Sequence, residues 1–148
     1  KNPWACAGFF GLTARHDEYH MIRAAYEGLA FSLYDCYQAF PSVYDEILLS
    51  GGGSKSNFLC QMFADGLGKA VKRPAQKELG IIGVADAVSV GLGIKDVSKI
   101  ETSQCHIFEP DMRKHQEYLR HFDLFFELRE SMKSYWGKRF DILSKGLA

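Results

Sequence analysis

The sequence predicts an α/β fold in which strands alternate with helices and a long helix closes the chain. A short apolar run, residues 47–49, stops at three consecutive glycines and is followed by apolar residues at helical spacing over residues 57–67. Further helix-like and strand-like segments alternate on either side, which indicates a layered structure with some parallel strand pairing. The segment 111–143 has the apolar spacing of one long helix.

The composition fits one soluble globular domain and argues against several classes of function. The chain has 148 residues, of which 47% are hydrophobic and 24% charged. Its 18 Lys and Arg residues balance 18 Asp and Glu residues, so no net charge attracts nucleic acid or an acidic membrane surface. No apolar run reaches the length of a membrane span, and no signal-peptide pattern is present. We expect a protein with neither nucleic acid nor membrane as its partner.

The cysteines and histidines do not predict a metal or disulfide site. The four cysteines are far apart and form no C-x-x-C pair. Cys36 and Cys60 lie on apolar faces of predicted helices, where a cysteine behaves as a small buried hydrophobe. His16 and His20 are one helical turn apart, but the glutamate of an H-E-x-x-H motif is missing. This pattern favours a reducing, cytoplasmic location.

The first half of the chain predicts a turn followed by a long helix. Residues 8–13 resemble the end of a strand and its turn, and a helix is expected over residues 16–40. Asp17 and Glu18 in its first turn suit the positive end of the helix dipole. A buried stripe is expected at the four-three-four spacing of Leu29, Leu33, Cys36 and Phe40, and Pro41 ends the helix.

The second half predicts two strands and three helices. A strand over residues 46–49 is followed by the glycine loop and by a helix over residues 56–67, which Gly68 closes. A second strand over residues 69–73 stops at Pro74. The segment 80–92 is apolar on nearly all sides, so we expect a helix buried between layers. In the final helix, an aromatic stripe predicts a packing face: Tyr118, Phe122, Phe125 and Phe126.

The glycine loop is the strongest indication of a ligand. Three glycines remove every Cβ from the turn, so the backbone can approach a phosphate or a ribose closely. The start of the next helix brings N–H donors to the same place. The loop lacks the Gly that precedes Lys-Ser in a Walker A loop, and Ser56 stands where a dinucleotide-binding G-x-G-x-x-G needs glycine. A tight turn without a ligand is the alternative, and any nucleotide site belongs to a different fold.

Several segments together resemble the FGGY carbohydrate kinases. Residues 7–27 are similar to the family's second signature, and residues 51–56 with Gln61 and residues 64–65 are similar to its G-G-G-A-x-S segment and the Q…A-D that follows. Glu78 with residues 83–85 resembles the later E…L-G-A-A stretch, and residues 108–110 fit the turn before an aromatic terminal helix. The resemblance covers almost the whole chain. Ser54 replaces the usual alanine, and residues 79–83 are bulkier than in the family pattern.

The resemblance implies a fold and a role for the glycine loop. The family has two actin-like, ribonuclease-H-like domains, and this chain resembles the C-terminal part of the second, nucleotide-binding domain. Gly51, Gly52 and Gly53 would then line the phosphate or ribose side of ATP. Ser54 belongs to the same loop, and Ser56 and Asn57 would lie near the adenosine. ATP with Mg²⁺ and a sugar or polyol are the implied ligands, with the sugar site in an N-terminal domain absent from this chain.

The resemblance places no catalytic residue in this chain. The family's catalytic aspartate and phosphate loop lie upstream, and five aspartates of this chain lie outside the matching motif: Asp17, Asp35, Asp45, Asp65 and Asp86. The chain alone is therefore expected to be inactive. The three glycines resemble pentulose kinases such as xylulokinase more than glycerol kinase. Another actin-like ATPase, or a non-catalytic interaction module, remains an alternative, and a homodimer stays open.

Overall fold

The computed structural model describes residues 3–40, 44–75, 79–96 and 104–146. Its three strands form one small sheet in the order β1–β2–β3. β1 (Glu46–Leu48) runs parallel to β2 (Ala70–Pro74), and β3 (Cys105–Phe108) runs antiparallel to β2. The parallel pair is joined by the 3₁₀ turn η1 (Gly52–Lys55) and the helix α2 (Asn57–Leu67). The predicted α/β class with parallel pairing is confirmed.

The core lies where α2 covers this sheet. Ile47 of β1 and Phe108 of β3 both pair with Val71 of β2, which is fully buried. Helix α2 contributes most of the remaining core side chains: Leu59, Cys60, Met62, Phe63, Ala64 and Leu67. The burial of Cys60 agrees with the prediction from the sequence. Because α2 is central, the position of its first residues also sets where the preceding loop lies.

The ends of α2 follow from local chemistry. Ser56 caps the helix, and its side chain accepts a hydrogen bond from the N–H of Leu59 at 3.2 Å. Gly68 ends it with a φ of 63°, in the left-handed region that favours glycine. A Cβ at Gly68 would also lie 2.6 Å from the ring of His115 on α4. Both predicted boundaries are therefore confirmed.

Helix α1 (Glu18–Gln38) packs on α2 through a different face from the predicted one. Asp17 caps it in a capping box with His20. The buried residue is Ala30, because Gly66 of α2 lets the two helices approach until a Cβ there would be 3.3 Å from the Ala30 Cβ. Of the predicted stripe, Leu33 packs on the core, whereas three members are exposed: Leu29, Cys36 and Phe40. Pro41 lies outside the described residues.

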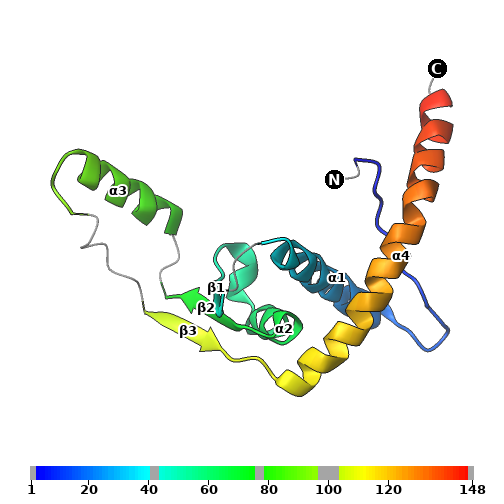
Figure 1. Ribbon diagram of the computed structural model, residues 1–148, viewed down its shortest axis with the longest axis horizontal. Coiled ribbons are helices and arrows are strands. Elements are labelled where there is room, and N and C mark those ends of the chain that lie inside the picture. Colours follow the sequence, from blue (N-terminus) through cyan, green and yellow to red (C-terminus); the bar gives the residue numbers. More distant parts are fainter. Residues whose placement is uncertain (1–2, 41–43, 76–78, 97–103, 147–148) are drawn as a thin grey trace.

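Helix α3 (Leu79–Gly91) contains no buried residue, so the prediction of a buried helix is wrong for this structure. Figure 1 shows it standing away from the sheet and from the other helices. Ile81 is 68% exposed, and a Cβ at Gly83 would meet no atom within 4 Å. An apolar sequence supplies a surface that could be buried, but burial also needs an element to pack against it, and no described element does so.

The structure differs from the sequence-based expectation at three further places. Residues 8–13 contain no strand; the chain is irregular there and bends at Gly11, whose φ is 77°. Strand β3 was not predicted, and it forms because residues 105–108 pair with the edge of β2. Pro74 is the last residue of β2 rather than a residue beyond it. A proline is tolerated at a strand end because few ladder hydrogen bonds are needed there.

Helix α4 (Met112–Lys145) closes the chain and crosses α1 (Figure 1). Asp111 caps it, accepting hydrogen bonds from the N–H groups of Arg113 and Lys114. The predicted aromatic packing face is confirmed for three of its four residues, since Phe31 of α1 contacts the rings of Tyr118, Phe122 and Phe125. The fourth, Phe126, is 40% exposed. Farther along α4, Phe140 stacks on Trp4 with ring centroids 3.6 Å apart.

Candidate functional site

The glycine loop connects β1 to α2 at the carboxyl end of the strand. Gly51 has φ 91° and ψ −167°, a backbone conformation that side-chain-bearing residues rarely adopt. A Cβ at Gly53 would lie 3.2 Å from Leu59, so that position has little room. A Cβ at Gly52 would meet nothing within 4 Å. The three glycines therefore differ in what a side chain would meet. The backbone angle disfavours one at Gly51, packing leaves little room at Gly53, and the space at Gly52 is open.

Ser54 stabilises the loop through hydrogen bonds within it. It is buried, and its hydroxyl donates a hydrogen bond to the carbonyl oxygen of Gly51 at 2.7 Å. The backbone N–H of Ser54 donates to the same oxygen at 3.2 Å. The Ser54 side chain is therefore used within the loop, whereas the other five residues assigned to the site are exposed: Gly51, Gly52, Gly53, Ser56 and Asn57.

The exposed residues surround the N-terminus of α2. The side chain of Ser56 accepts from Leu59 N–H, and the carbonyl of Ser56 accepts from Cys60 N–H at 3.0 Å. The first N–H groups of a helix have no partner within the helix, and they carry the positive end of its dipole. The exposed loop residues therefore lie beside the positive end of the α2 dipole, a setting that suits phosphate or hydroxyl oxygens.

Arg73 of β2 braces this loop, a role that the sequence did not reveal. Its Nη1 donates to the carbonyl oxygen of Ser54 at 2.9 Å and to Oδ1 of Asn57 at 2.8 Å. The thiol of Cys60 donates to the same Ser54 oxygen at 3.3 Å. Burial raises the pKa of the Cys60 thiol, and the neighbouring Arg73 charge opposes that rise. The signal in the sequence was only a basic residue in the strand that pairs with β1.

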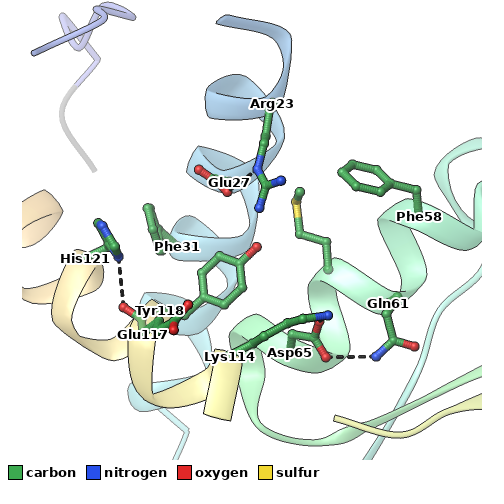
Figure 2. Close-up of a pocket in the computed structure, with 11 residues that line it drawn as sticks. Arg23, Glu27, Phe31, Phe58, Gln61, Asp65, Lys114, Glu117, Tyr118 and His121 are labelled. Atoms are coloured by element: carbon green, nitrogen blue, oxygen red, sulfur yellow. Dashed lines mark hydrogen bonds and ion pairs between the residues drawn. The ribbon is translucent and has the colours of Figure 1, made fainter. Parts of the chain in front are cut away.

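A separate pocket of about 410 Å³ lies between α1, α2 and α4 (Figure 2). Four of its charged groups form two pairs: Arg23 with Glu27 at 2.9 Å, and Lys114 with Asp65 at 3.5 Å. Glu27 raises the pKa of Arg23, chiefly through their hydrogen bond. None of the six residues predicted for the nucleotide lines this pocket, although the next residue, Phe58, does.

Asp65 at this pocket has a structural role. Its carboxylate is buried and accepts hydrogen bonds from Gln61 Nε2 at 2.8 Å and from the backbone N–H of Asp111 at 2.9 Å. Gln61 Nε2 also donates to the carbonyl of Glu109 at 2.8 Å. The Gln and Asp that resemble the family's Q…A-D segment thus tie α2 to the turn before α4.

No membrane span or metal cluster is found in the part of the chain that the structure describes. No helix there is long and apolar enough to cross a membrane. No group of three or more His, Cys, Asp or Glu residues among the described residues could hold a metal ion. His20, one of the two histidines spaced by a helical turn, contacts the Asp17 carboxylate as part of the α1 capping box.

Comparison with known proteins shows the family. Residues 1–91 match the C-terminal domain of the FGGY family of carbohydrate kinases. The chain belongs to the FGGY family. Human glycerol kinase 5 is 30% identical over 125 residues, which are 79% of this chain and 23% of that protein. The chain spans about a quarter of the length of the curated FGGY relatives it matches.

Solved FGGY structures have the same fold. The ligand-bound xylulose kinase from Lactobacillus acidophilus is 27% identical with a TM-score of 0.81, covering 91% of this chain and 29% of that one. The glycerol kinase from Plasmodium falciparum, solved with ADP, is 20% identical with a TM-score of 0.67, covering 81% and 26%. The predicted fold, part of an actin-like domain with a long C-terminal helix, is confirmed.

Proposed function

We propose that this chain is the nucleotide-binding C-terminal part of an FGGY kinase that transfers the γ-phosphate of ATP to a sugar or polyol hydroxyl. The observation that carries the proposal is the exposed glycine loop at the N-terminus of α2, held in a conformation that requires glycine at position 51. Family membership supports the kinase class. The ADP in the glycerol kinase of the same fold supports the nucleotide.

The residues of the loop have distinct proposed roles. Gly51, Gly52 and Gly53 approach the phosphates or the ribose, because Gly52 has no neighbour that would fill the space outside it. Ser56 and Asn57 lie near the adenosine. Ser54 acts indirectly, since its hydroxyl already holds the loop together. A pentulose is the proposed sugar, in line with the loop sequence and with the likeness to xylulose kinase.

The sugar site and the catalytic base are proposed to lie in a domain outside this chain. Four aspartates of this chain have structural partners. Asp17 caps α1, Asp35 pairs with Arg129, Asp65 ties α2 to α4, and Asp86 pairs with Lys95. The described residues offer no carboxylate cluster that fits Mg²⁺, so no Mg²⁺ ligand is assigned here. The 148-residue chain alone is accordingly expected to show no phosphotransfer from Mg-ATP to any member of a pentulose panel.

A substitution at Gly52 tests the proposal in the complete kinase, the polypeptide that joins this chain to its sugar-binding domain. The free loop has room for a side chain at Gly52, so Gly52→Val should fold normally but occupy the space of the ligand. We expect ADP affinity to fall at least tenfold, about 1.4 kcal/mol, with sugar affinity unchanged in calorimetry. Unchanged ADP affinity would make the glycines a structural turn and favour the interaction module.

A further inference from the structure

Arg73 donates two hydrogen bonds from one guanidinium nitrogen, one to the glycine loop and one to the first residue of α2. Nη1 contacts the Ser54 carbonyl oxygen at 2.9 Å and Asn57 Oδ1 at 2.8 Å, one at each end of the segment that enters α2. The guanidinium also lies over the Phe108 ring of β3, 5.2 Å from its centroid. The sheet therefore holds Arg73 from one side while Arg73 holds the loop from the other.

This contact fixes which way the amide of Asn57 faces. A guanidinium carries only hydrogen-bond donors, so the atom of Asn57 that meets it is the carbonyl oxygen. The NH₂ group of the exposed Asn57 side chain is then the part left for a ligand. Without Arg73, the amide could turn over and present its oxygen instead.

We propose that Arg73 is a positioning residue for nucleotide binding, which turns Asn57 so that its NH₂ group donates to an acceptor atom of the nucleoside. The inference rests on the proposed function, because it assigns a specific contact to the same loop. In a nucleoside, the atoms that can accept such a hydrogen bond are the ring nitrogens of the purine and the hydroxyl oxygens of the ribose. A loop that is merely braced by Arg73 would bind the nucleotide without using the Asn57 amide.

Asn57→Asp separates these two cases. Aspartate has nearly the same shape, and its carboxylate strengthens the contact with Arg73 because the hydrogen bond becomes charge-assisted. It has no N–H group to donate. If Arg73 only braces the loop, the variant keeps its affinity for adenosine, which has no phosphates for the new charge to repel. If Asn57 donates to the nucleoside, the adenosine affinity falls although the contact with Arg73 is intact.

The experiment is calorimetry on the complete kinase with ADP, adenosine and the sugar as separate probes. Asn57→Asp and Arg73→Met are each expected to weaken ADP and adenosine binding about fivefold or more, the effect of one lost hydrogen bond, with sugar affinity unchanged. Lys72→Met is the matched control, since Lys72 precedes Arg73 on β2 and pairs with Glu46 instead of the loop. It should leave all three affinities unchanged.

Each result of these binding measurements either supports or overturns the proposed role of Arg73. If Asn57→Asp binds adenosine as tightly as the unmodified kinase does, the inference is overturned, even where ADP affinity falls through repulsion of its phosphates. If Arg73→Met unfolds the kinase, the adenosine affinity of Asn57→Asp still distinguishes a donating amide from a simple brace. If the unmodified kinase binds neither nucleoside nor nucleotide, the proposed function itself fails, and the Arg73 role fails with it.

Discussion

Helices α2 and α3 are both short and apolar, yet they have opposite environments. Eight of the eleven residues of α2 are buried, whereas none of the thirteen residues of α3 is. Helix α2 covers a sheet on one side and meets α1 and α4 on the other, while α3 stands apart from the other described elements in Figure 1. The comparison teaches that apolar content alone does not determine burial, because a helix also needs a partner surface of matching shape.

The largest effect should come from deleting a core side chain of α2. Phe63 of α2 is 7% exposed, so Phe63→Ala should lower the free energy of unfolding by about 3–5 kcal/mol through the cavity it leaves. Phe58, also on α2 but 54% exposed, is the control, and Phe58→Ala should change it by less than about 0.5 kcal/mol. Urea denaturation measures both. Equal effects would show that α2 is not the centre of the core.

The next largest effect on stability should come from replacing an aspartate of α2, compared with an aspartate of α3. Asp65→Ala leaves the Asp111 N–H without its acceptor and removes one of the two acceptors of Gln61 Nε2, which should cost about 1–3 kcal/mol. Asp86→Ala on α3 removes only a pairing with Lys95, so we expect a loss below about 1 kcal/mol. The same denaturation assay compares them. A larger loss at Asp86 would mean that α3 is anchored more firmly than α2.

Two helical glycines give the smallest contrast. Gly66→Val should overpack the contact with Ala30 and destabilise the protein by about 1–3 kcal/mol. Gly83→Val on α3 should change the stability by no more than about 0.5 kcal/mol, because a side chain there meets open space. The buried helix expected from the sequence would instead predict a loss of about 1–3 kcal/mol at Gly83. Thermal melts of both variants decide between the sequence expectation and the structure.

Local features of this chain could be predicted because they depend on neighbouring residues. Ser56 and Gly68 mark the ends of α2 through a side-chain cap and a positive φ, and both are visible in the sequence. The aromatic face of α4 follows from helical spacing alone. The FGGY resemblance likewise rests on residues in order along the chain, and the family comparison confirms it.

Features that depend on contacts between distant segments could not be predicted. The face of α1 that is buried depends on Gly66, 36 positions beyond Ala30, and periodicity could not choose between adjacent stripes. Strand β3 forms through pairing with β2, and its four residues carry no strong pattern of their own. Arg73 reaches the loop only because β2 lies beside β1, so its role is invisible until the sheet is assembled.

The central claim is that the glycine loop, and not another apolar or glycine-rich segment, binds the nucleotide. Glycine-selective ¹⁵N labelling of the complete kinase tests it most directly, because α3 supplies internal controls in Gly80, Gly83 and Gly91. On addition of ADP, the amide signals of Gly51, Gly52 and Gly53 should shift while those of the three α3 glycines stay in place. Saturable ADP binding that moves the α3 signals and leaves the loop signals unchanged would contradict the account.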